Sequence, residues 1–179
     1  VCKVMKYPVS YVIANEVELH EVAKINSRTE RWKPIDFVRC YVETGNKNYE
    51  IMMRFLIDYH LPVSSALMIL SAGITKPMPR TQRLMKEFEE GQFVVLALDE
   101  AETIMTWAMQ FEGFEGIASK AFLRAITMIL KSELCDMYDL VKRYRQNPSA
   151  LLTQPNYKKY LANLEDIYNR SRQKRQTIF

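Results

Sequence analysis

The chain has 179 residues, of which 48% are hydrophobic and 26% are charged, and its formal net charge at pH 7 is +4. This balance is typical of a folded globular protein and excludes an intrinsically disordered chain. The longest apolar runs, at 66–70 and 93–98, are far shorter than the roughly 20 residues that span a bilayer, so we expect no membrane segment.

The cysteines and histidines suggest neither a disulfide framework nor a metal centre. Cys2, Cys40 and Cys135 are odd in number and far apart, which favours buried thiols in a reducing compartment. His20 and His60 do not combine with them at a zinc-like spacing. We therefore predict a cytoplasmic protein with no metal site and no cofactor.

Positive charge is concentrated near the C-terminus. Residues 142–179 contain nine lysines and arginines against two acids, whereas the preceding residues contain 16 cations and 19 acids. A basic end on a nearly neutral body suggests an anionic partner such as nucleic acid, and a solvated tail explains the same count equally well.

The first 33 residues resemble the remnant of a mixed α/β domain. The chain starts at Val1 without the pattern of a secretion signal, so we expect residues to be missing upstream. Residues 1–6 resemble the end of a helix, 7–13 predict a strand, and 18–25 form an amphipathic segment. A lone strand leaves its backbone groups unpaired, so it must pair upstream, with a partner, or with residues 93–96.

The junction at 26–36 gathers the side chains that phosphate binding needs. Asn26 and Ser27 are short polar donors, Arg28 and Arg31 are forked cations, and Pro34 opens a helix. We predict Asn26, Arg28 and Arg31 as nucleotide or phosphate ligands. The competing interpretation is a solvated cap between two helices.

From residue 34 onward the sequence is almost wholly helical in pattern. Pro34 at a first helical position and Gly45 just past the end delimit one helix, and Asn48 can cap the next. Further helices are expected at 62–71, 79–90, 99–113, 117–130, 133–146 and 156–172, and a short strand at 93–98. The acids at 99–102 predict an N-terminal capping pair, which we prefer there to a metal site.

The helices at 62–71 and 79–90 have the pattern of a helix-turn-helix unit. The first is apolar, the proline-containing turn at 74–79 forbids helix, and the second carries side chains that reach phosphates and base edges. Acids at 87, 89 and 90 follow at once, so a solvated helix face remains the alternative. No glycine-rich phosphate loop, nucleophile motif or repeat is present, and we assign no catalytic residue.

The segment 26–36, with its preceding strand and following helices, resembles the ParB family of chromosome-partitioning proteins. The likeness is closer to divergent relatives in phages and mobile elements of Bacteroides-type bacteria. Four residues match the family pattern: Asn26, Trp32, Pro34 and Asp36. Thr29 stands where the family has an arginine, while Arg28 and Arg31 match the divergent group. The likeness continues through 49–73, 90–93, 167–169 and 178–179. In the family, the nucleotide-binding signature, a glycine followed by paired polar residues and an arginine, lies just before the helix whose end we expect at 1–6, and this sequence does not contain it.

We therefore predict a mainly α protein: a ParB-like α/β remnant at 1–33, a helix-turn-helix-like region at 34–98, and a C-terminal helical region with a basic tail at 99–179. The resemblance implies binding of duplex DNA, and we lean away from an enzyme. The predicted DNA-binding residues are Lys76, Arg80, Gln82, Arg83, Lys86, Arg170, Arg172, Lys174 and Arg175. The alternative is a protein-interaction or inhibitor module without nucleic-acid binding, and a homo-oligomer is an open option for either function.

Overall fold

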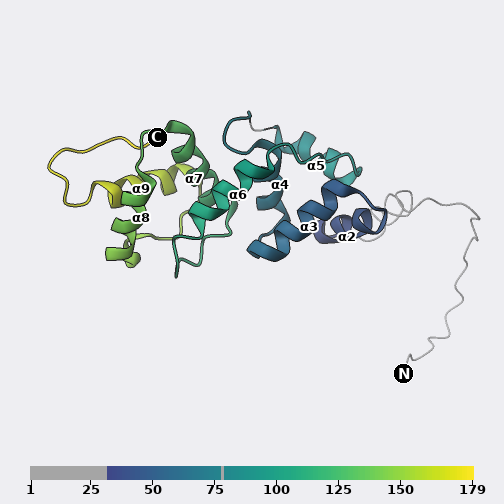
Figure 1. Cartoon of the computed structure of the whole chain (residues 1–179), viewed down its shortest axis with the longest axis horizontal. Coiled ribbons are helices and arrows are strands. Elements are labelled where there is room, and N and C mark those ends of the chain that lie inside the picture. The colour runs from purple at the N-terminus through teal and green to yellow at the C-terminus, as the bar shows by residue number, and fades with distance from the viewer. Residues whose placement is uncertain (1–31, 78) are drawn as a thin grey trace, which may run out of the picture.

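The computed structural model describes residues 32–77 and 79–179, and this part of the chain is mainly α-helical (Figure 1). Its helices are α2 (Pro34–Glu43), α3 (Lys47–Tyr59), α4 (Val63–Ala72), α5 (Thr81–Glu89), α6 (Leu98–Ala108), α7 (Lys120–Ser132), α8 (Met137–Gln146), the 3-10 turn η1 (Pro148–Ala150) and α9 (Tyr157–Asn169). No β-strand forms among these residues, so the mainly α prediction is confirmed for them. The predicted helix end at 1–6, strand at 7–13 and amphipathic segment at 18–25 lie outside the described residues.

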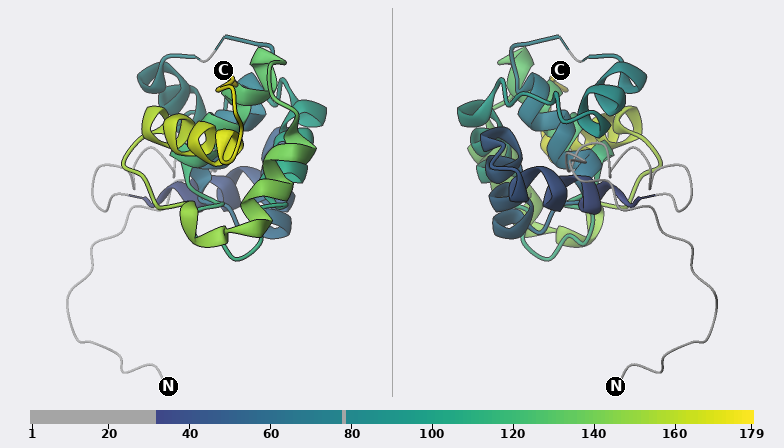
Figure 2. Two further views of the ribbon diagram at one scale, coloured as in Figure 1. Left: turned by 90° about the vertical axis from the view of Figure 1, so that its left-hand side faces the viewer. Right: turned by 90° about the vertical axis from the view of Figure 1, so that its right-hand side faces the viewer.

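The helices pack against both sequence neighbours and more distant helices, and they form an elongated molecule (Figure 1). Helix α2 packs on α3, α4 packs on α3, α6 and α7, and α9 packs on α7 and α8. Seen end-on, α8 and α9 form one end of the molecule, and α2 and α5 lie toward the other (Figure 2). One cluster of buried side chains extends from Phe37 to Ile178, so residues on both sides of the predicted boundary at 98/99 belong to it.

The start of α2 agrees with the sequence. Pro34 is its first residue, where a missing N–H costs no helical hydrogen bond. The Asp36 carboxylate accepts a hydrogen bond of 2.9 Å from the backbone N–H of Lys33. Gly45, with φ of 76°, lies just beyond the helix end and supplies the left-handed conformation that L-residues avoid.

Helices α3 and α4 meet at a sharp corner. The chain bends by 120° between them, and His60 adopts a left-handed conformation with φ of 51°. Helix α4 is mostly apolar, and eight of its ten residues are buried, so it is a central helix of the fold. None of the helices in the described part of the chain is by itself long and apolar enough to cross a bilayer.

The strand predicted at 93–98 is wrong. These residues have no regular secondary structure as far as Ala97, and α6 begins at Leu98. The N–H of Val95 donates to the Asn48 side chain (2.9 Å), and the N–H groups of Leu96 and Ala97 donate to a carbonyl at the end of α4 (3.0 and 3.2 Å). Asn48 is therefore not the N-cap of α3.

The cap of α3 is Asn46, whose side-chain oxygen accepts a hydrogen bond from the N–H of Asn48 (3.1 Å). Helices predicted to start at 79, 117 and 133 begin later, at Thr81, Lys120 and Met137. For α7 and α8 the start is set by a capping side chain of the preceding residue.

The capping pair predicted at 99–102 is also wrong, because α6 begins earlier, at Leu98, and has no side-chain cap. The Glu100 carboxylate accepts hydrogen bonds from the N–H groups of Ile74 (2.5 Å) and Thr75 (2.8 Å) and from the Thr75 hydroxyl (2.7 Å). The hydrogen bonds from Thr75 and Ile74 lower the pKa of Glu100. Glu100 thus fixes the first residues of the connector between α4 and α5.

Candidate nucleic-acid interface

The predicted nucleotide or phosphate ligands, Asn26, Arg28 and Arg31, lie outside the described residues and stay predictions. Trp32 is the first described residue of the segment 26–36, and its ring centroid lies 5.2 Å from that of Phe37 in α2. This contact joins the junction segment to the core.

Helix α5 is held on the surface by its C-terminal end. Phe88 is fully buried, with its ring centroid 5.9 Å from Phe37 and 5.7 Å from Tyr49. The Tyr49 hydroxyl donates to the Phe88 carbonyl (2.5 Å), and the Tyr41 hydroxyl donates to the Glu89 carbonyl (2.8 Å). Two side chains of α2 and α3 thus fix the position of α5.

The five predicted DNA-binding side chains near α5 have different surroundings. Arg80, Gln82 and Lys86 are exposed, and neither Arg80 nor Gln82 makes a side-chain hydrogen bond to another described residue. Arg83 donates to Glu87 (2.6 Å), and Lys76 donates to the Leu96 carbonyl. Lys86 lies 4.0 Å from the carboxylate of Glu90. Glu87 of α5 and Glu90, which follows the helix, therefore each pair with a cation of α5.

The connector between α4 and α5 runs from Gly73 to Arg80, which is longer than the turn of about three or four residues in a compact helix-turn-helix. Helix α5 packs against α2. The helix-turn-helix unit accordingly stays a prediction, while the exposed side of α5 is a feature of the structure.

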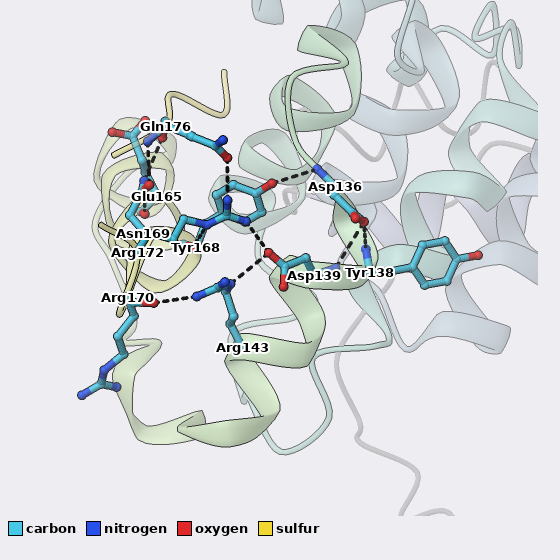
Figure 3. Close-up of polar contacts among 10 residues, drawn as sticks. All are labelled: Asp136, Tyr138, Asp139, Arg143, Glu165, Tyr168, Asn169, Arg170, Arg172 and Gln176. Carbon is cyan, nitrogen blue, oxygen red and sulfur yellow. Dashed lines mark hydrogen bonds and ion pairs between the residues drawn. The ribbon is translucent and has the colours of Figure 1, made fainter. Parts of the chain in front are cut away.

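The basic C-terminal segment is folded against α8 and α9 (Figure 3). The Arg172 guanidinium donates to the Asp139 carboxylate, to the Tyr168 carbonyl (3.0 Å) and to the Gln176 side chain (2.7 Å). It also lies 4.2 Å from the centroid of the Tyr168 ring, a cation–π geometry. Arg172 is therefore occupied by contacts within the chain.

Asp139 connects this segment to α8. It accepts a second charged hydrogen bond from Arg143 Nε (2.9 Å), and Arg143 Nη1 donates to the Arg170 carbonyl (2.5 Å). Burial acts to raise the pKa of Asp139, but the hydrogen bonds and charges of Arg143 and Arg172 outweigh it and lower that pKa. Two arginines thus hold one partly buried carboxylate in its charged form.

The end of the chain is anchored as well. Arg175 contacts the carboxylates of Asp166 (2.6 Å) and Glu165 (3.4 Å). Ile178 is fully buried, and its carbonyl accepts a hydrogen bond from Ser132 Oγ (2.8 Å). Lys174 is exposed and has no partner in the described part of the chain, and the Arg170 guanidinium points away from the network (Figure 3).

The predicted DNA-binding residues therefore form two groups that the structure does not bring together. The α5 group lies toward one end of the long axis, and the C-terminal group lies at the other (Figure 1). In the first group Arg80 and Gln82 have no side-chain partner among the described residues, and Lys86 has only its exposed pair with Glu90. In the second group Lys174 has no such partner, whereas the Arg170 guanidinium lies beside the Asn147 side-chain amide.

A further cationic surface, which sequence reasoning missed, lies between α6 and α8. A groove of about 330 Å³ is lined there by Trp107, Tyr138, Lys142 and Arg145, among others. The only signal in the sequence is the spacing of residues 138, 142 and 145, which places them on one face of α8. Nothing in the sequence pattern links them to Trp107.

The described residues offer no obvious metal or nucleophile chemistry. No group of three potential ligands among His, Cys, Asp and Glu occurs within them. Burial, together with the negative charges of Asp136 and Asp139, raises the pKa of Cys135 to about 12, so its thiol stays protonated at neutral pH.

Comparisons with protein-family models, with curated proteins and with solved structures find no match to this chain. The ParB resemblance and the DNA-binding function stay predictions, and what the surfaces can bind follows from their geometry and charge.

Proposed function

We propose that this chain is a ParB-like DNA-binding protein that contacts duplex DNA through the exposed side of α5. The observation that supports this most is the exposure of Gln82 and Lys86 on a short helix, and of Arg80 at its N-cap, with the helix anchored to the core by the buried Phe88. Arginine and lysine contact phosphates, and glutamine can read the edge of adenine. A side chain on a fixed helix also loses less entropy on binding than one on a free arm.

The C-terminal segment has a smaller part in this proposal than its composition suggests. Arg172 and Arg175 are engaged with carboxylates, so a phosphate would have to compete with partners at hydrogen-bond distance. Lys174 remains available for an additional phosphate contact, whereas the Arg170 guanidinium lies beside the Asn147 side-chain amide.

The test is a charge reversal on α5. In fluorescence-anisotropy titrations with random duplex DNA, we expect Arg80→Glu with Lys86→Glu to weaken binding by roughly tenfold or more at low salt. If both cations contact phosphates, the slope of log affinity against log salt should fall by about two.

The matched control is Lys158→Glu with Lys159→Glu, which makes the same charge change at two exposed positions of α9. Equal losses in the two double variants would mean that only net charge matters and would overturn the role of α5. Absence of binding by the unmodified protein at low salt would overturn the function itself.

A protein-interaction module is the second candidate, and one observation favours it. Beside α5 lies a groove of about 570 Å³, with Val94 and Leu96 on its wall at 51% and 54% exposure. These two apolar side chains alternate with the more buried Phe93, Val95 and Ala97, so together they present apolar surface that a protein partner can cover. The duplex titration separates the candidates, because an apolar groove predicts no salt-dependent DNA binding.

A further inference from the structure

The groove between α6 and α8 combines an exposed aromatic pair with two cations. The ring centroids of Trp107 and Tyr138 are 4.8 Å apart, with an interplanar angle of 80°. Tyr138 is 78% exposed, the highest value among the exposed large hydrophobic side chains of the described residues. This edge-to-face contact fixes the orientation of the tyrosine ring and leaves much of the ring exposed to solvent.

The cations lie one turn apart on α8. Lys142 is exposed and has no partner within the described residues, and Arg145 donates only one hydrogen bond, from Nη2 to Gln110 Oε1 (2.8 Å). Val141 forms an apolar floor, and no carboxylate is among the lining residues. The nearby Asp139 is engaged by Arg143 and Arg172. The groove is therefore positive and partly aromatic.

We propose that this groove binds an unpaired stretch of nucleic acid, with a base stacked on Tyr138 beside Trp107 and its phosphates on Lys142 and Arg145. The inference rests on the proposed nucleic-acid binding and adds a second ligand class, single strands, at a site apart from α5. Aromatic platforms beside cations bind single strands because every base has a π-face and every nucleotide carries a phosphate.

The groove suits a single strand better than a duplex. Base faces are covered by stacking in a duplex, so an upright tyrosine ring has nothing to stack on there. The Gln110 amide nitrogen, which makes no hydrogen bond to the described residues, lies in the same groove and can donate to a base edge or phosphate. The volume of about 330 Å³ falls at the lower end of small-ligand sites, which suits one nucleotide unit of a longer strand.

The chain has two tryptophans, so the variant Trp32→Phe makes Trp107 the only source of tryptophan emission. We expect a short oligo(dT) or oligo(rU) to quench this emission, a duplex of equal length to quench it much less, and dTMP to require far higher concentrations. The two oligonucleotides show whether the groove prefers DNA or RNA.

In the same background, Tyr138→Ala should weaken single-strand binding roughly tenfold, whereas Tyr138→Phe should stay within about twofold. Position 138 is exposed, so neither change threatens folding. Lys142→Ala with Arg145→Ala should weaken binding and lower its salt dependence.

Two results would overturn the inference while leaving the α5 proposal intact: duplex binding without quenching by either single strand, or equal single-strand affinities of Tyr138→Ala and Tyr138→Phe. Binding of single strands without any duplex binding would instead support the groove and overturn the role of α5. Absence of binding to any nucleic acid would overturn both.

Discussion

The buried tyrosine hydroxyls among the described residues differ in whether they have a hydrogen-bond partner. The hydroxyl of Tyr144 donates to the Glu112 carbonyl (2.7 Å), and that of Tyr49 donates to the Phe88 carbonyl. The hydroxyl of Tyr160, a fully buried residue among the rings of Phe114 and Phe122, has no partner in the described part of the chain. An unpaired buried hydroxyl costs about 1–3 kcal/mol of desolvation, whereas a paired one contributes about 1 kcal/mol.

Removing these hydroxyls should therefore have opposite effects on stability. We expect Tyr160→Phe to leave the free energy of unfolding unchanged or raise it by about 1 kcal/mol, and Tyr144→Phe to lower it by about 1 kcal/mol. Denaturant unfolding followed by circular dichroism measures both changes. A loss in Tyr160→Phe as large as that in Tyr144→Phe would show that the Tyr160 hydroxyl is hydrogen-bonded in solution.

Residues that act on their own helix could be predicted from the sequence, and residues that act across the fold could not. Pro34 and Gly45 were placed correctly because their backbone preferences decide the ends of α2. Asn48 and Glu100 also have the side chains of capping residues, but each serves backbone N–H groups in a distant segment. Local pattern cannot tell which N–H groups a polar side chain will meet after folding.

At the scale of elements, the segment after α9, residues 170–179, contacts both α8 and α9 and so holds the chain end in place. Arg172 and Arg143 share Asp139, and the side chains of Arg172 and Asp139 are 22% and 27% exposed. Removing one partner of a partly buried ion pair leaves a desolvated charge, which costs more than losing a surface pair.

We therefore expect Arg172→Ala to lower the free energy of unfolding by about 1–2 kcal/mol at neutral pH, and Lys174→Ala, the matched control at an unpartnered cation, to lower it by less than about 0.5 kcal/mol. The lowered pKa of Asp139 means that its stabilising contribution is present above the ordinary aspartate range and lost as pH falls through the lowered value. The gap between wild type and Arg172→Ala should accordingly narrow in acid. Equal stabilities of the two variants at neutral pH would contradict this role.

Composition predicted the positive charge of this segment but not which of its cations are paired within the protein. Counting cations near the C-terminus cannot separate Arg172, which is held by Asp139, from Lys174, which is open to solvent. The exposed side of helix α5 was easier to predict, because the helix has a strong amphipathic period. The strand predicted at 93–98 failed because the end of α4 and the Asn48 side chain supply its hydrogen-bond partners.

At the scale of the whole molecule, the groove between α6 and α8 depends on tertiary structure alone. Trp107 and Tyr138 belong to different helices, which are brought together by a series of contacts: α6 packs on α7, α7 on α9 and α9 on α8. The mainly α class could be predicted from periodicity, since the helices are amphipathic and well separated by turns. Periodicity could not predict which exposed faces of these helices lie side by side and form a common surface.

The shared core also makes a prediction about cooperativity. Helices α4, α6 and α7 pack on one another across the predicted boundary at 98/99, so we expect the described part of the chain to unfold in one transition. Trp32, beside α2, and Trp107, in α6, can each be made the sole tryptophan by replacing the other with phenylalanine. The two emission transitions should coincide with each other and with the far-ultraviolet circular dichroism signal.

Cavity variants at the two ends sharpen this test. Met52→Ala in α3 and Leu164→Ala in α9 remove fully buried side chains, and each should cost about 2–5 kcal/mol. If the core is one cooperative unit, each variant shifts both tryptophan transitions by the same amount, because neither half has a folded state without the other. A variant that moved only the transition of the nearer tryptophan would show instead that 34–98 and 99–179 unfold as separate domains.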